Sequence, residues 1–134
     1  MYEWRSHTAE IELAIEAATE EEVFADALTA FVELVATNER QVTDCYKEER
    51  GVALEAPDRA SLLVEWLQEL IFLADTESFI AGRADDLRVA DGSLNATLVG
   101  RRTAFEPLVK AATYHGLSFE REGNKWQARV VLDV

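Results

Sequence analysis

The clearest structural signal in the chain is the segment 57–74, which reads PDRASLLVEWLQELIFLA. Proline followed by aspartate at its start is typical of a helix beginning. Behind them, leucines and a tryptophan recur at helical spacing, at positions 62, 63, 66, 67, 70 and 73, in a stripe wide enough to lie flat on a sheet. Glu65, Gln68 and Glu69 fall between these positions and face water. The segment therefore predicts an amphipathic helix, and it is the strongest core element in the sequence.

Another helix is predicted earlier in the chain, from about Glu20 to Ala36. Thr19 followed by Glu22 has the spacing of a capping box at a helix start. Behind this start, apolar residues recur at helical spacing, namely Val23, Phe24, Ala27, Phe31, Leu34 and Val35.

Strands are predicted where the apolar period falls to two residues. In 10–16, isoleucines and a leucine alternate with glutamates and an alanine, as in a strand with one face in the core and one in water. The segment 42–56 is more mixed and is read as one strand or two. Asp91-Gly92 and Gly123-Asn124 each separate two alternating runs, which is the signature of a two-residue hairpin. The second hairpin extends to Val134, so we expect the final residue to belong to the sheet.

The elements together predict an α+β fold. Two helices among roughly six or seven strands, many joined by tight turns, indicate a mainly antiparallel sheet with both helices packed on one face. A chain of 134 residues is long enough for one core and too short for two of ordinary size. No repeat, linker or composition break divides it, so we expect a single domain over residues 1–134.

Charge limits the classes of partner. The sequence has 26 acidic and 13 basic residues, a formal net charge of −13. Phosphates would meet a repulsive field without the clustered lysines and arginines that drive nucleic-acid binding. We therefore expect no tight direct binding of RNA or DNA, and a surface that favours basic protein partners or divalent cations. An acidic composition is also common in ordinary soluble proteins.

The cellular location is inferred from cysteine content and from the apolar runs. Cys45 is the single cysteine, which excludes an internal disulfide framework and a cysteine-rich zinc site. Residues 1–10 are polar and charged, without an apolar signal segment behind a basic start. The longest apolar run, 70–74, is far shorter than the roughly 20 residues that cross a bilayer. These features favour the cytoplasm.

Motifs for catalysis are not recognisable in the sequence. The six glycines are scattered singly, so no phosphate-binding loop is present, and no nucleophile, base and orienting acid form a known pattern. His7 and His115 lack the spacing of a helical zinc pair, and such histidines are more often structural residues. A small hydrolase using a carboxylate and His115 stays open as a hypothesis, although no nucleophile or pocket supports it.

Carboxylates are the plentiful functional group, and Glu10 and Asp133 are the most interesting pair. Each lies on the polar side of a strand otherwise full of core residues, at opposite ends of the chain. Strand ends often converge in a compact sheet, and clustered carboxylates with backbone or water oxygens suit calcium, magnesium or manganese. The plainer interpretation is that both are solvated residues on a strand face.

Four segments of the chain carry a family resemblance. They are HTAE (7–10), LLVEWLQEL (62–70) with Phe72 and Asp75 close behind, VKAATYH (109–115) and VVLDV (130–134). In this order and roughly this spacing they resemble the archease family, and four ordered matches are much more specific than any one. The resemblance spans most of the chain.

The resemblance implies an accessory role and no enzymatic activity. Archeases assist the RtcB-type RNA ligase, which joins RNA ends using GTP and manganese. The implied function is to help guanylylation and repeated turnover of that ligase in tRNA splicing or RNA repair, without making a phosphodiester bond. The alternative that stays open is a chaperone-like acidic interaction module without metal. In that module Glu10 and Asp133 are dispensable. Binding depends instead on charge distributed over the surface, which salt screens.

The resemblance also implies site residues. The metal site of the family uses an acid of the N-terminal motif, an aspartate next to the C-terminus and the C-terminal residue, which correspond to Glu10, Asp133 and Val134 in this chain. The implied cofactor is a divalent cation: calcium, magnesium or manganese. The functionally important lysine of the family corresponds to Lys110.

Three more residues of the matching segments, His7, Tyr114 and His115, are candidates for partner contact. The run 113–115 reads equally as a strand with an inward aromatic and an outward polar side chain. Two departures from the family pattern affect the site. Glu10 stands where the family usually has aspartate and reaches one methylene further, which would alter coordination geometry or metal preference. The connection 101–109 is shorter than expected, so docking would differ in detail if that loop touches the ligase.

Overall fold

The computed structural model describes residues 1–7, 10–36, 39–41, 48–102, 104–105 and 109–134. These residues form two helices, α1 (Glu20–Ala36) and α2 (Arg59–Glu77), and nine strands. The strands are β1 (Tyr2–His7), β2 (Glu10–Ala17), β3 (Glu39–Gln41), β4 (Glu48–Glu55), β5 (Phe79–Ala90), β6 (Ser93–Arg102), β7 (Ala104–Phe105), β8 (Ala111–Glu122) and β9 (Lys125–Asp133). Cys45 and the first part of the predicted strand segment, 42–47, lie outside the described residues. So do 8–9 of the first matching segment, and 103 and 106–108 of the short connection.

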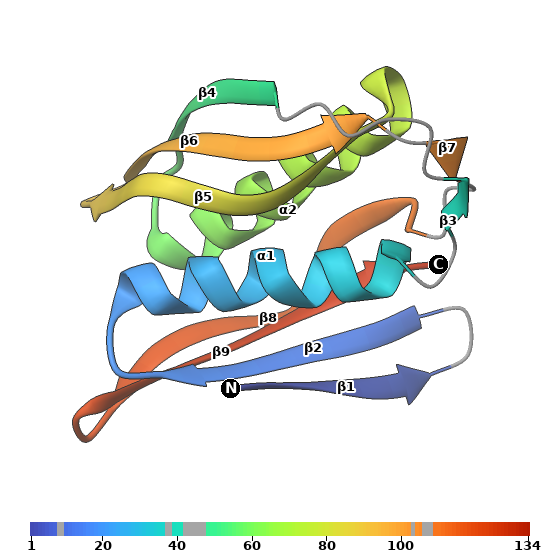
Figure 1. Ribbon diagram of the computed structural model, residues 1–134. Helices are drawn as coiled ribbons and strands as arrows, with labels where there is room; N and C mark the ends of the chain where they lie inside the picture. Colours follow the sequence, from blue (N-terminus) through green and yellow to red (C-terminus); the bar gives the residue numbers. More distant parts are fainter. Residues whose placement is uncertain (8–9, 37–38, 42–47, 103, 106–108) are drawn as a thin grey trace.

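All strand pairs are antiparallel, and the α+β class is confirmed. The strands form a four-stranded sheet in the order β1-β2-β9-β8, a three-stranded sheet in the order β4-β6-β5, and the small pair β3-β7. Both helices contact strands of the two larger sheets and lie between them (Figure 1). The sequence predicts one sheet with the helices on one face, so the division into two sheets is a difference from the prediction.

The apolar surface of α2 explains this division. Its buried residues are Leu62, Leu63, Val64, Trp66, Leu67, Leu70, Ile71, Leu73 and Ala74. At 100° per residue these positions cover about 200° of the helix circumference. One sheet cannot cover so wide a surface, and the second sheet buries the remainder.

The helix starts follow their predicted caps. The Thr19 Oγ1 accepts a hydrogen bond from the amide of Glu22 at 3.1 Å, and the Glu22 Oε2 accepts one from the amide of Ala18 at 3.3 Å. This is a capping box in which the Glu22 side chain accepts from the amide of Ala18 instead of the amide of Thr19. The Asp58 Oδ1 accepts from the amide of Ser61 at 2.7 Å, and this bond lowers the pKa of the Asp58 carboxyl. Neither helix in the described part of the chain combines the length and the apolar character needed to cross a membrane.

An aromatic cluster fixes both helices on the four-stranded sheet. Trp66 is fully buried, and its Nε1 donates to the carbonyl oxygen of Phe24 at 2.9 Å. The ring of Phe24 lies edge-on to Trp66, with centroids 6.3 Å apart, and 5.7 Å from the ring of Phe119 on β8. Phe119 in turn contacts Trp126 of β9 at 5.7 Å. The cluster therefore positions the sheet in which β2 and β9, from opposite ends of the chain, pair directly.

Both predicted hairpins are present. Gly92 between β5 and β6 and Gly123 between β8 and β9 have φ angles of 70° and 66°, in the left-handed region that favours glycine. The predicted strand at the C-terminus is one residue too long, because β9 ends at Asp133. Val134 lies beyond the strand, with its side chain packed against the core.

Candidate metal and partner site

The candidate site lies where β2 begins and β9 ends. Glu10 is the first residue of β2, Asp133 is the last residue of β9, and the two are direct partners in the antiparallel pairing. The neighbouring pairings place His7 of β1 opposite Glu10 and Ala111 of β8 opposite Asp133. One row of residues, which we call the Glu10–Asp133 row, therefore crosses all four strands. The expected convergence of the two strand ends is observed in the backbone.

Lys110 and Val134 adjoin the Glu10–Asp133 row. The amide of Lys110 donates to the carbonyl oxygen of Asp133 at 2.8 Å, and the Lys110 side chain is exposed. Val134 directly follows Asp133 and is anchored by its side chain on the core. The structure therefore brings together the four residues that the archease resemblance marks for metal binding and activation. Their roles stay predictions.

Glu10 and Asp133 lie on the outer face of the four-stranded sheet, away from the helices. In β9, Val130 and Leu132 are buried beneath the helices. Asp133 is the next residue of the strand and so lies on the opposite face. Both carboxylate residues are half-buried. Directly opposed residues of an antiparallel pair have Cβ atoms roughly 4.5–5.5 Å apart, so the Glu10 and Asp133 side chains leave β2 and β9 side by side on this face. Two carboxylates on neighbouring side chains can share one cation.

The donor set is small for a metal site. Among the residues that the structure describes, no group of three histidine, cysteine, aspartate or glutamate side chains is arranged to hold a metal ion. Glu10 and Asp133 supply two carboxylates, whereas calcium takes about six to eight oxygen ligands and magnesium about six. The remaining oxygens would come from Val134, the main chain and water.

Thr113 is a polar residue of this region that the sequence analysis did not single out. Its Oγ1 is buried and has no hydrogen-bond partner among the described residues. Thr113 pairs with Val131, which makes it a diagonal neighbour of Asp133 on the same face. A buried hydroxyl of this kind calls for an oxygen partner, and a water coordinated beside Asp133 would supply one. The residues present therefore fit a hydrated, oxygen-coordinated cation.

Tyr114 and His115 lie further along β8 and outside the Glu10–Asp133 row. The β8–β9 register is irregular between Thr113 and Ser118, and both residues are exposed. The Tyr114 side chain is 58% exposed, and its hydroxyl donates to Glu65 Oε1 of α2 at 3.4 Å. Tyr114 therefore lies on the helix-facing side of β8, but its side chain is not part of the core. His115 has no hydrogen-bonded carboxylate in the described part of the chain, so the pair required by the hydrolase hypothesis is not assembled there.

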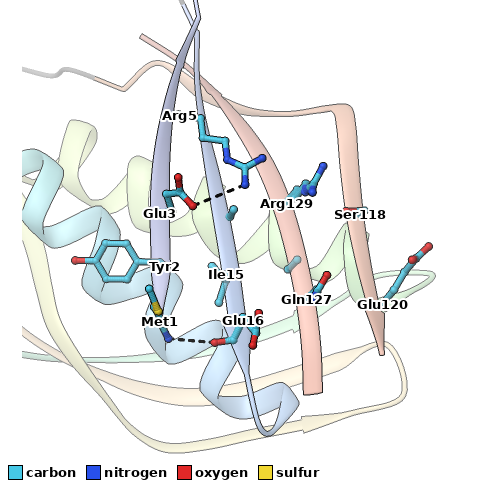
Figure 2. A pocket seen from close by; sticks show the side chains of 12 residues that line it. Met1, Tyr2, Glu3, Arg5, Ile15, Glu16, Ser118, Glu120, Gln127 and Arg129 are labelled. Atoms are coloured by element: carbon cyan, nitrogen blue, oxygen red, sulfur yellow. Dashed lines mark hydrogen bonds and ion pairs between the residues drawn. The ribbon is translucent and has the colours of Figure 1, made fainter. Parts of the chain in front are cut away.

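A separate pocket of about 440 Å³ lies on the same outer face, nearer the other end of the strands (Figure 2). Small residues, Ala14 and Ser118, line it between longer side chains. Figure 2 shows Arg5 and Arg129 toward one end, and Glu16 toward the other. No predicted site residue lines this pocket, and its mixed charges do not select a ligand of one sign.

Comparison with known proteins identifies the family. Residues 2–134 match the Archease protein family (MTH1598/TM1083). The chain belongs to the archease family. It is 32% identical over 142 residues to Protein archease of Methanosarcina barkeri, with 99% of this chain and 95% of the relative covered. It is 35% identical over 122 residues to Protein archease of Methanothermobacter thermautotrophicus, with 85% and 84% covered.

Solved structures share this archease fold. The solution structure of Methanobacterium thermoautotrophicum protein 1598 superposes with a TM-score of 0.66 at 26% identity, covering 99% of this chain and 98% of that one. The crystal structure of an archease from Thermotoga maritima, described as a possible chaperone, superposes with a TM-score of 0.62 at 25% identity, covering 100% and 98%. The archease resemblance drawn from the four sequence segments is therefore confirmed.

Proposed function

We propose that this chain is an accessory factor that activates an RtcB-type, GTP- and metal-dependent RNA ligase in tRNA splicing or RNA repair. In this role it promotes guanylylation and repeated turnover of the ligase and makes no phosphodiester bond itself. The supporting observation is the Glu10–Asp133 row with Lys110 beside it. Residues that the archease resemblance marks as functional come from distant segments and meet at one end of one sheet.

The proposed metal site binds calcium, magnesium or manganese through Glu10, Asp133 and the terminal carboxylate of Val134. A cation bound there neutralises the two neighbouring carboxylates. The Thr113 hydroxyl supports the site from beside Asp133, as an outer residue that bonds to a coordinated water.

Calorimetry with each of the three ions tests metal binding. We expect a saturable heat at a pH where carboxylates are ionised, and weaker binding when a tag extends the chain past Val134, because the tag removes the free carboxylate. The absence of saturable heat with all three ions would remove the metal from the proposal.

Lys110 is the proposed contact to the ligase. Its side chain is exposed in a chain of net charge −13, and it forms no ion pair with the other described residues. An ammonium group in this position is free to meet a phosphate or an acidic group of the ligase. The backbone bond to Asp133 holds Lys110 beside the proposed cation.

Multiple-turnover RNA joining and ligase-GMP formation, measured with the ligase of the same organism, test the activation. Substoichiometric amounts of the protein should stimulate both. Lys110→Ala and Asp133→Ala should each abolish stimulation while changing the free energy of unfolding, measured without divalent cation, by less than about 1 kcal/mol, because neither side chain lies in the core. Lys125→Ala is a matched control, since it removes an exposed lysine from the far end of the same sheet. If Lys110→Ala and Asp133→Ala stimulate like the parent while folding normally, the assigned site is wrong.

An acidic interaction module without metal is the second candidate. Two observations favour it: the net charge of −13, and the lack of a three-residue ligand group in the described ranges. A relative from Thermotoga maritima is described as a possible chaperone. This candidate predicts that Asp133→Ala stays active and that salt dissociates the complex with the partner, because distributed surface charge is screened.

A further inference from the structure

An exposed aromatic surface lies where α2 runs along β8. Leaving Met1 aside, the exposed large apolar side chains of the described residues are Phe72, at 52% exposure, and Tyr114, at 58%. Glu65, Glu69 and Phe72 follow one another at intervals of four and three residues and so share one face of α2. The Tyr114 hydroxyl donates to Glu65 from β8. We call these four residues the α2–β8 surface.

The α2–β8 surface extends toward the candidate site. Two contacts define how helix and strand pass each other: the bond of Tyr114 just described, and a bond of 3.1 Å from Gln68 Nε2 to the carbonyl oxygen of Ala112. The contact of the later helix residue is with the earlier strand residue, so helix and strand run antiparallel. Between the two contacts the helix advances by about 4.5 Å and the strand by about 6.6 Å. One further helical turn brings Phe72 level with Lys110. Along the axis of α2, the aromatic surface thus reaches the level of the proposed ligase contact.

Two other contacts of this protein show what a ring beside a carboxylate binds. Arg50 lies over the ring of Phe79 at 5.1 Å and pairs with Glu77 at 2.9 Å. Arg59 lies over the ring of Trp126 at 4.7 Å and also pairs with a glutamate of α1 at 2.9 Å. In both places a guanidinium is held by a ring face on one side and a carboxylate on the other.

The α2–β8 surface presents the same two groups without a cation. Within the described part of the chain, Glu65 and Glu69 form no ion pair, and no arginine or lysine lies over the ring of Phe72 or Tyr114. We propose that the α2–β8 surface binds arginine side chains on the protein surface of the ligase, next to the contact made by Lys110. This inference rests on the proposed function and adds a docking surface to it.

Charge argues for this occupant over others. A second copy of the chain, docked by the same surface, would bring Glu65 and Glu69 against their own counterparts. RNA and anionic membranes carry the same sign as this surface and are repelled. A protein surface with exposed arginines complements both the carboxylates and the rings.

The test is a titration of each variant against a fixed amount of ligase, in which the half-maximal concentration is read separately from the maximal stimulation. Phe72→Ser and Glu69→Gln should each raise the half-maximal concentration by about tenfold or more, as for the loss of an interface anchor. The maximum should stay unchanged, because the Glu10–Asp133 row is intact. Glu120→Gln removes an exposed acid from the outer sheet face and is the matched control.

The outcomes separate the two proposals. If the parent protein does not stimulate the ligase, the proposed function is wrong. If the parent stimulates and both Phe72→Ser and Glu69→Gln act at the parental concentration, the α2–β8 surface is not the docking site. Sedimentation that shows loss of self-association in these variants, with an unchanged ligase titration, would assign the surface to a second copy and also overturn the inference. Unchanged melting curves exclude unfolding as the cause of a weaker titration.

Discussion

Asp133→Asn should alter stability in opposite directions with and without a divalent cation. Asp133 faces Glu10 directly across β2 and β9, and both residues are half-buried on the outer face. Paired residues have Cβ atoms about 5 Å apart, and two like charges at about that distance repel by about 0.8 kcal/mol in water-like surroundings. Salt reduces this value and burial raises it. Without cation, the neutral and nearly isosteric asparagine should therefore stabilise the protein by about 0.5–1 kcal/mol.

With cation, the order of stability should invert. A cation that binds only the folded state at 100 times its Kd stabilises the parent by about 2.7 kcal/mol. Asparagine removes one of the two carboxylate ligands, so the variant should lose most of this gain. Subtracting the relieved repulsion leaves the parent more stable than Asp133→Asn by about 2 kcal/mol.

The assay is urea unfolding of both proteins with a chelator and with saturating calcium, magnesium or manganese. Glu120→Gln is the matched control, because Glu120 is an exposed acid of the same sheet that lies on β8, far from Asp133, and is paired with Gln127. It should relieve no repulsion across β2 and β9 and should keep the full cation-dependent gain. Two results would refute the reasoning: an Asp133→Asn protein less stable than the parent in chelator, or equal gains from cation in parent and variant.

Three further substitutions test the fold and the site. Asp58→Ala removes the N-cap of α2 and should lower the melting temperature. The capping bond lowers the pKa of Asp58 in the folded state. The difference in melting temperature should therefore be full above the ordinary aspartate pKa and should shrink as pH falls through the lowered folded-state pKa. Thermal unfolding curves recorded across that pH range test this. Trp66→Phe deletes the bond to the Phe24 carbonyl and leaves a cavity, so urea unfolding should show a loss of about 2–4 kcal/mol with an unchanged m-value. Glu10→Asp introduces the shorter acid that the archease resemblance implies at this position, and it should keep a cation-dependent rise in melting temperature while changing which ion gives the largest rise.

The helices and hairpins could be predicted because their signals are local. The caps at Thr19 and Asp58 each act within one helical turn, and the turn at Asp91-Gly92 depends on two adjacent residues. Strand β1 was not predicted, although Tyr2 and Trp4 pack against the core and alternate with exposed residues. A short edge strand with a charged outer face has a weak apolar pattern.

The division into two sheets depends on non-local pairing, which periodicity does not encode. β2 pairs with β9 from the other end of the chain, whereas β4 pairs with β6 across the whole of α2. The apolar stripe of α2 is visible in the sequence, but its width alone does not say whether one sheet or two will cover it. The assignment of strands to sheets therefore follows from how the helices are buried in three dimensions.

For the candidate site, the sequence predicts only what the alternation of residues along a strand determines, namely which face of the strand a residue lies on. Alternation places Glu10 and Asp133 on the polar face of their strands, and the structure agrees. It also places Tyr114 on the side of Ala112, where its hydroxyl meets Glu65 of α2, but it does not predict that the ring stays 58% exposed. Beyond Tyr114 alternation no longer applies, because the register of β8 shifts between Thr113 and Ser118 and Gly116 adopts a left-handed φ of 68°.

The start of β8 has two different surroundings. The amide of Lys110, just before β8, bonds to Asp133, which places Lys110 at the Glu10–Asp133 row. The ring of Tyr114 stays outside the core, and its hydroxyl donates to Glu65 of α2. Gln68 bonds to the strand between these two points, at the carbonyl oxygen of Ala112. One short segment of an edge strand therefore positions both the proposed activating lysine and the proposed docking surface. A partner bound to Tyr114 and Phe72 would meet Lys110 in a fixed orientation, so docking affinity and activation can depend on separate residues of neighbouring elements.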